Sequence, residues 1–133
     1  MLFESFFGSI RDILLDNQKF DIAYLFSWII FLISMIPDFI TTQISFQIKG
    51  LSERNQFQII FFHTENPFNH IIYYVLIFVC FVFIIEVGRK IAIKKCQNNI
   101  LLINGISMLV PLTMAFVLIE ISIENYFLIL QYL

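Results

Sequence analysis

Three long apolar runs constrain the fold of this chain more than any other feature. They cover Ile22–Ile40, Phe68–Ile85 and Ile100–Ile121. An α-helix rises about 1.5 Å per residue, so each run is long enough to cross about 30 Å of hydrocarbon. The helix also satisfies its own backbone hydrogen bonds, as a bilayer requires. The sequence therefore predicts an all-α integral membrane protein with a three-helix bundle.

The composition agrees with a membrane location and indicates partners. Hydrophobic residues make up 59% of the 133 residues and charged residues 14%, whereas charged residues are about a quarter of a soluble domain. Three spans enclose little interior, so we expect membrane lipids and other integral membrane subunits as neighbours. The net charge of −2 provides no basic face for phosphate backbones, which argues against nucleic acid as a partner.

The segment 1–20 is amphipathic and precedes a transmembrane domain that we place at 21–133. Its apolar residues recur at spacings of three and four: Leu2, Phe3, Phe6, Phe7, Ile10, Ile13 and Leu14. This spacing predicts a helix that lies in the membrane interface, or alternatively one that packs on a neighbouring subunit. The segment lacks the basic start and small-residue cleavage site of a secretory signal, so we expect it to stay on the protein.

The basic residues are distributed unevenly among the predicted loops. Lys49 and Arg54 follow the first span, whereas the other six Lys and Arg residues fall before the first span or between the second and third. Three spans place those two regions on the same side. The positive-inside rule then predicts a cell-membrane protein with a cytoplasmic N-terminus and an outside C-terminus.

Proline and glycine residues indicate where the helices bend, begin and end. Pro37 and Pro111 predict local bends within the first and third spans, because proline removes a helical hydrogen bond. Gly50 is a natural stop for the first helix, and Pro67 suits the first turn of the second. The apolar patch at 57–62 predicts a short interfacial helix in the connecting segment.

A polar stripe follows one face of the first span into its end. Its members recur at spacings of three or four: Ser34, Asp38, Thr41, Thr42 and Ser45. Asp38 requires a polar or charged partner, because an unpaired charge in hydrocarbon costs at least a few kcal/mol. Thr41 and Thr42 are its neighbours on the same helix. Across the bundle, the candidate partners are Asn69, Tyr73, Glu120 and Glu124.

The stripe continues into a motif that resembles a known family pattern. Its residues read Asp-x-x-x-Thr followed by Gly-x-x-Glu-x-Asn, and they are Asp38, Thr42, Gly50, Glu53 and Asn55. This pattern resembles an uncharacterised family, a domain of unknown function, of small prokaryotic multi-span membrane proteins. The resemblance covers about residues 26–126 in the order of spans. It departs at Gln56, where that family prefers Pro, and early in the second span, where Tyr73 and Tyr74 stand instead of Lys. The resemblance implies a helical membrane fold with a polar cluster near one membrane face.

Two interpretations of this cluster remain open. In the first, it binds a proton or cation through oxygen and imidazole ligands drawn from Asp38, Glu53, His63, Glu65 and His70. In the second, which we favour, Asp38 and the threonines satisfy backbone groups that Pro37 leaves open, while Glu53 and Asn55 cap the turn after Gly50.

Charged residues elsewhere suggest contacts within the helices and between chains. Glu86 is spaced to pair with Arg89 or Lys90 on the second span. The third span carries two opposite polar faces, namely Thr113, Glu120 and Glu124 on one and Asn104, Ser107 and Pro111 on the other. We expect one of these faces to meet Asp38 and the other to meet a foreign subunit.

No motif in the sequence predicts catalysis. Cys80 and Cys96 have neither the spacing of a zinc site nor a probable disulfide geometry, and we assign them to packing or to no role. A GxSxG elbow and a Gly-rich phosphate loop are both absent. We therefore expect a protein that is not an enzyme and has no cofactor or metal.

The most economical function is a noncatalytic accessory subunit of a larger membrane complex, of the kind that surrounds respiratory or metal-dependent oxidase or monooxygenase cores. The alternative is a small homo-oligomeric proton or cation transporter or channel, in which Asp38, Thr41 and Thr42 line the path. A metal enzyme that uses Asp38, Glu53 and His63 ranks last.

Overall fold

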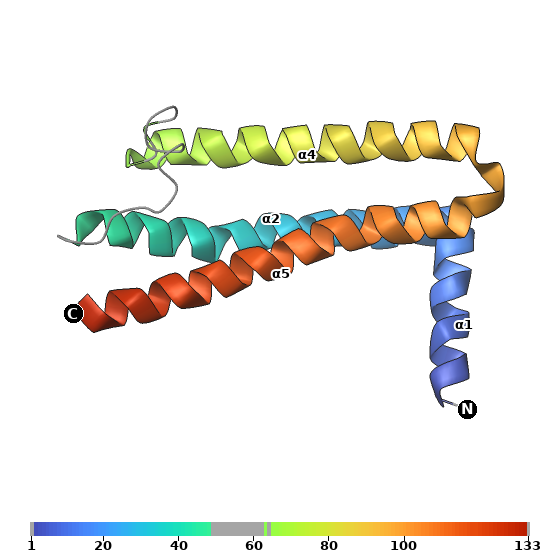
Figure 1. Cartoon of the computed structure of the whole chain (residues 1–133), viewed down its shortest axis with the longest axis horizontal. Helices are drawn as coiled ribbons and strands as arrows, with labels where there is room; N and C mark the ends of the chain where they lie inside the picture. The colour runs from blue at the N-terminus through green and yellow to red at the C-terminus, as the bar shows by residue number, and fades with distance from the viewer. Residues whose placement is uncertain (1, 49–62, 64, 133) are drawn as a thin grey trace.

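The computed structural model describes residues 2–48, 63 and 65–132. Within these residues the chain is helical and forms no strand. The elements are α1 (Leu2–Leu15), α2 (Asn17–Gln47), α4 (Pro67–Lys95), the short 3-10 turn η1 (Gln97–Asn99) and α5 (Ile100–Tyr132). The helices α2, α4 and α5 are long and apolar enough to cross a membrane (Figure 1). The predicted all-α fold with three candidate spans is confirmed.

The first helix boundary is set by Asp16. Its carboxylate accepts hydrogen bonds from the backbone N–H groups of Gln18 and Lys19, at 3.0 and 3.1 Å. These N–H groups have no partner within the helix, so a side-chain acceptor at this position starts α2. The amphipathic helix consequently ends at Leu15, inside the segment 1–20 that was predicted to contain it.

The other helix ends follow the same logic. The Asn66 side chain accepts from the Phe68 N–H at 2.9 Å, and Pro67 opens α4, as its position predicts. Helix α2 runs past Asp38 and ends at Gln47. The predicted stop at Gly50 and the predicted interfacial helix at 57–62 lie outside the described residues. All three long helices thus extend beyond their apolar runs, because such a run marks the hydrocarbon and not the end of the helix.

The three long helices lie side by side with alternating connections. Helices α2 and α5 both run from the end that carries α1 toward the opposite end, and α4 runs back between them in the chain (Figure 1). Helix α1 runs across the long helices and not along them. Two ends of the bundle can therefore be distinguished: the basic end, where α1, η1 and the start of α5 meet, and the Asp38 end, where α2 finishes and α4 begins.

Small residues bring α2 and α5 together. Helix α2 buries Ser27, Ser34 and Thr41 at a spacing of seven, and α5 buries Ala115 and Ser122 at the same spacing. This is the repeat that keeps one seam of two crossing helices in contact. In a membrane, small side chains allow backbones to approach closely and gain van der Waals contact. The α2–α5 interface is accordingly the most extensive between helices.

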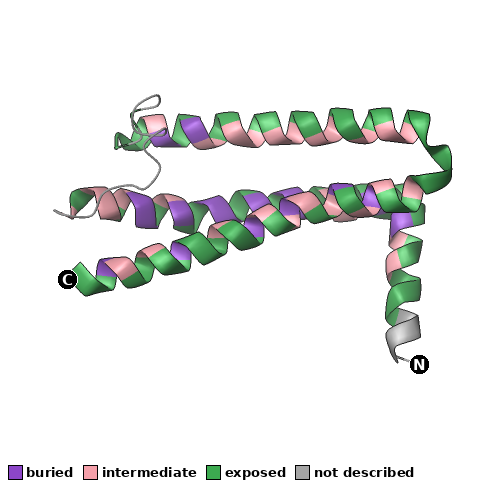
Figure 2. Cartoon of the chain, in the orientation of Figure 1, coloured by how far each residue is buried: buried purple, intermediate pink, exposed green. Residues whose placement is uncertain are grey.

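Aromatic side chains attach α4 to this pair. Trp28 and Phe31 of α2 lie 5.8 and 6.0 Å from the ring of Phe78, and Phe31 also contacts Phe81. Such ring pairs each add a modest gain beyond area burial. The buried residues of α4 are only His70 and Tyr73, so most of this helix faces outward (Figure 2).

A polar contact between described residues of α1 and α5 lies at the basic end. The side-chain amide of Asn104 on α5 donates to the carbonyl of Leu14 at 2.9 Å, and the Leu14 side chain is buried. That carbonyl belongs to the last turn of α1, where helical partners run out. Phe6 and Phe7, farther along α1, are exposed. Helix α1 is thus joined to α5 near its C-terminal end, and its place in the membrane interface stays a prediction.

Candidate functional site

Asp38 forms the central contact of the Asp38 end. It is 8% exposed, and its carboxylate accepts a hydrogen bond from the hydroxyl of Tyr74 on α4. The candidates predicted across the bundle were Asn69, Tyr73, Glu120 and Glu124, and of these Tyr73 is adjacent to Tyr74 but lies about 100° away around the helix. Tyr73 is buried beside the ring of His70 instead. The expectation that Asp38 finds a partner across the bundle is therefore met, but by the neighbouring tyrosine.

A second polar pair lies next to the first. His70 is fully buried, and its Nδ1 lies 2.7 Å from Nε2 of Gln43 on α2. The Gln43 amide and the imidazole are thus within hydrogen-bond distance, and the tautomer of His70 sets which group donates. Nε2 of His70 has no hydrogen-bond partner in the described chain. The His70 ring stacks on Tyr74 at 4.7 Å, which joins the two pairs. We call Asp38, Gln43, His70 and Tyr74 the polar cluster.

The threonines of the stripe serve the backbone of their own helix. The Thr41 hydroxyl donates to the carbonyls of Pro37 and Asp38, at 3.0 and 3.2 Å. It does not reach the carbonyl of Ile33, four residues before Pro37, which the proline leaves without its helical donor. The prediction that Thr41 satisfies the backbone carbonyl left open by Pro37 was therefore wrong. Helix α2 continues through Pro37, and Thr42 is buried beside Thr41.

Several other predicted residues do not join the polar cluster. Glu53 and Asn55 lie outside the described residues. Glu120 and Glu124 are exposed on α5, on the side opposite the buried Asn104. The third span was predicted to carry two polar faces. The face with Asn104, Ser107 and Pro111 is buried in the bundle. The face with Thr113, Glu120 and Glu124 is exposed.

The proposed cation ligands are also dispersed. The exposed His63 imidazole lies 3.8 Å from the Glu65 carboxylate, just before α4 begins, and the Asn69 side chain donates to the His63 carbonyl at 3.5 Å. Over the described part of the chain, no three His, Cys, Asp or Glu side chains gather as a metal site would require. The described residues therefore do not bring the proposed cation ligands together, and Glu53, which both interpretations use, lies outside them.

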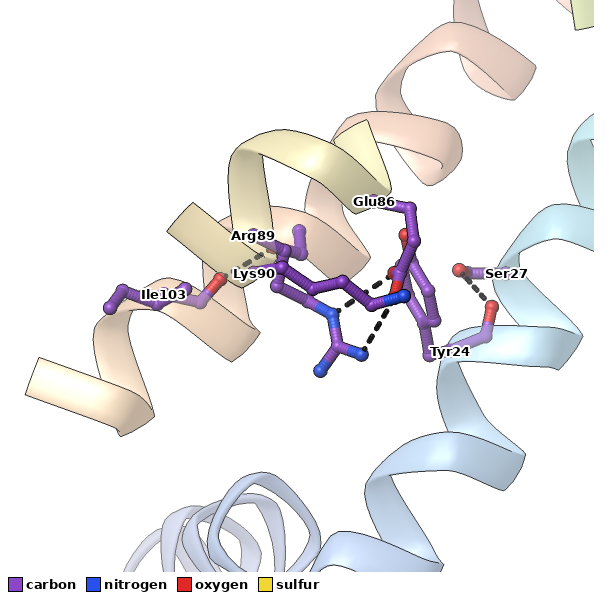
Figure 3. Close-up of polar contacts among 7 residues, drawn as sticks. Tyr24, Ser27, Glu86, Arg89, Lys90 and Ile103 are labelled. Carbon is purple, nitrogen blue, oxygen red and sulfur yellow. Dashed lines mark hydrogen bonds and ion pairs between the residues drawn. The ribbon is translucent and has the colours of Figure 1, made fainter. Parts of the chain in front are cut away.

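An ion-pair cluster fastens α4 to α2 at the basic end. Glu86 lies 3.2 Å from Arg89 and 3.3 Å from Lys90, which confirms the predicted pairing along α4 (Figure 3). The Arg89 guanidinium also lies over the rings of Phe20 and Tyr24 on α2, at 5.1 and 5.4 Å. A cation over an aromatic face gains about 0.5–1 kcal/mol at exposed sites and about 2 kcal/mol or more when it is desolvated. Sequence reasoning found the ion pairs but missed these ring contacts.

An apolar groove opens between α2 and α4 beside the polar cluster. Its volume is about 400 Å³. Its lining includes Leu32, Ile36, Phe39, Ile71, Val75 and Phe78. Tyr74, whose hydroxyl bonds to Asp38, also borders this groove, and its other lining residues are apolar. The groove provides space for apolar groups and carries no arrangement of nucleophile and base.

No protein-family model, curated protein or solved structure matches this chain. The geometry of the described residues is consequently the basis for any functional assignment.

Proposed function

We propose that the protein is a noncatalytic accessory subunit of a larger membrane complex. The observation that carries this proposal is the incomplete enclosure of α4. Of its residues only His70 and Tyr73 are buried, and a groove remains open between it and α2. A helix that contributes so little buried surface gains little packing from its own bundle. A neighbouring chain would supply the missing contacts.

The polar groups inside the bundle support a structural role. Asp38 bonds to Tyr74 near one end of the α2–α4 pair, and Arg89 contacts Phe20 and Tyr24 near the other. These contacts fix the position of α4 along α2 where apolar packing alone would allow sliding. Polar contacts that set register are a recognised use of buried polar residues.

The orientation and location are part of the same proposal. The Lys and Arg residues of the described chain all belong to α1, the start of α2 and the end of α4, and are Arg11, Lys19, Arg89, Lys90, Lys94 and Lys95. The positive-inside rule places this basic end in the cytoplasm. The resemblance to small prokaryotic membrane proteins favours a prokaryotic cell membrane, and a respiratory or metal-dependent oxidase or monooxygenase core is the kind of assembly we propose.

Photocrosslinking in native membranes tests the proposal. A photoreactive residue replaces Val75, in the groove, or Phe83, which is exposed on α4 and does not line the groove. We expect Val75 to crosslink to a defined membrane protein that copurifies in mild detergent, with Phe83 giving a lower yield of that adduct. Crosslinks to lipid alone from both positions, together with a monodisperse free monomer, would contradict the proposal.

The unpartnered Nε2 of His70 favours proton or cation transport as a second candidate. Among the described residues this ring nitrogen has no partner, so the buried imidazole can exchange a proton with a transient donor, and Tyr74 stacks on His70 and bonds to Asp38. Several copies would have to enclose the path. The variant Asp38→Asn separates the candidates: loss of ion flux in liposomes with assembly unchanged supports transport, and loss of assembly with no flux in the parent protein supports the accessory role.

A further inference from the structure

A polar hollow lies at the turn between α4 and α5. Its volume is about 550 Å³, and it is lined by Lys94, Lys95, Cys96, Gln97, Asn98 and Asn99. The two lysines end α4, and the other lining residues lead through η1 to the start of α5. We call this feature the turn hollow. Lysine ammonium groups and side-chain amides both donate hydrogen bonds, so the turn hollow favours an anion that accepts them.

The positive charge of the turn hollow is not neutralised by the described chain. Lys94 and Lys95 are exposed. The nearest acid along the chain, Glu86, is already paired with Arg89 and Lys90. Among the described residues no ion pair uses either lysine of the turn hollow. The two ammonium groups are therefore available to an anion from outside the described chain.

The place of the turn hollow in the fold puts it at a membrane surface. It joins the end of one candidate span, Pro67–Lys95, to the start of the next, Gln97–Tyr132. These two helices run in opposite directions, and their connection lies at the basic end (Figure 1). A turn this short cannot carry the chain far from the helix ends that it joins. When α4 and α5 cross a bilayer, the two lysines consequently lie near the lipid headgroups.

Exposed apolar side chains extend along α4 from these lysines. Successive residues of a helix are about 100° apart, so Ile84, Val87 and Ile91 lie within about 30° of a line midway between Lys94 and Lys95. Their side chains are 63%, 38% and 51% exposed. We call these three residues the α4 track. From Ile84 to Lys95 the helix advances about 16 Å, which is about half of a 30 Å hydrocarbon core and thus one leaflet.

The turn hollow and the α4 track together select an amphiphile. A free phosphate ion would use the hollow but not the track, and a zwitterionic lipid would not neutralise the two lysines. Basic pockets at the ends of transmembrane helices bind anionic headgroups. We propose that one anionic phospholipid binds here, with its phosphate in the turn hollow and one acyl chain along the α4 track. This inference goes beyond the proposed function and does not require it.

Native mass spectrometry of the full chain in neutral detergent tests the headgroup. The probes are phosphatidylglycerol and phosphatidylcholine with the same acyl chains, and we expect one phosphatidylglycerol to bind about tenfold more tightly or better. Lys94→Gln together with Lys95→Gln should weaken its binding about 25-fold, because each lysine near an anionic headgroup contributes about fivefold. The matched control is Arg11→Gln together with Lys19→Gln. It removes two exposed charges outside the turn hollow and should leave the Kd unchanged.

A phosphatidylglycerol with a photoreactive diazirine in one acyl chain tests the track. In the parent protein its adducts should map to the α4 peptide around residues 84–91. This labelling decides the inference even if the Gln variant fails to fold. Equal affinity for the two lipids, full binding in the Lys94 and Lys95 variant, or adducts spread evenly over α2, α4 and α5 would overturn the inference. So would displacement of the lipid by an equal concentration of inorganic phosphate, which would indicate a phosphate site without a bound acyl chain.

Discussion

The hydrogen bond between Tyr74 and Asp38 allows a quantitative test of how α4 is held. The variant Tyr74→Phe keeps the ring that stacks on His70 and removes only the hydroxyl. Tyr74 takes part in another interaction besides this bond, so the single variant cannot isolate the pair. A double-mutant cycle with Asp38→Ala can, because each variant removes one side of the same bond.

The expected magnitude follows from burial and from the membrane reference state. A hydrogen bond to a charged group contributes about 1.5–3 kcal/mol in soluble proteins. Polar pairs between membrane helices average about 0.6 kcal/mol and reach about 1.7, since separated helices also find partners in the bilayer. Asp38 is 8% exposed, which favours the upper part of that range. We expect Tyr74→Phe to lower the free energy of unfolding by about 1–1.5 kcal/mol when Asp38 is present.

The second arm of the cycle gives the opposite expectation. Once Asp38→Ala has removed the buried carboxylate, the Tyr74 hydroxyl has lost its acceptor there, so the same variant should cost less than about 0.5 kcal/mol. Steric trapping in bicelles measures the free energy of unfolding for all four proteins. Tyr126→Phe, at an exposed position, is the control and should change it little. Equal costs for Tyr74→Phe in both backgrounds would refute the reasoning.

Three further predictions concern the other contacts. Ala115→Leu should weaken the α2–α5 seam by about 1–3 kcal/mol through overpacking, as the same unfolding measurement would show; an unchanged value would contradict close packing there. Asn104→Ala should release the Leu14 carbonyl and speed amide hydrogen exchange in α1 but not in α4, and equal protection of α1 in both proteins would contradict the anchor. The Lys19 backbone N–H holds the pKa of the Asp16 carboxyl below its ordinary value. The contribution of this cap to stability is therefore complete above the unfolded pKa of about 4, and it is lost as the pH falls through the lower folded pKa. Hydrogen exchange at the start of α2 should accelerate in that acid range. The variant Asp16→Asn should remove this pH dependence.

The sequence predicts the helical frame well because its signals are local. An apolar run of 18 or more residues has few stable forms in a membrane other than a helix. The spacing of Glu86, Arg89 and Lys90 is also a property of a single helix, and the structure confirms those ion pairs. The start of α4 at Pro67 depends on one turn of backbone and is predicted for the same reason.

The partners in the candidate site could not be predicted in the same way. The polar stripe shows that Asp38 needs a contact, but the choice between Tyr73 and Tyr74 depends on how α4 is rotated about its axis. The pairing of Gln43 with His70 depends in addition on how far α4 slides along α2. Neither rotation nor sliding leaves a signal in a helix that is apolar on every side.

The sequence alone predicts helices that are long and apolar enough to cross a membrane, and it shows where the costly polar residues fall along them. Only the tertiary structure shows that α5 turns Asn104 inward and Glu120 outward. Both faces of this helix carry polar residues, so the sequence pattern does not indicate which face is buried. The small residues of α2 pack against the face of α5 that carries Ala115 and Ser122, because small side chains let the two backbones approach closely. The carboxylates of α5 are left outside as a consequence of that packing.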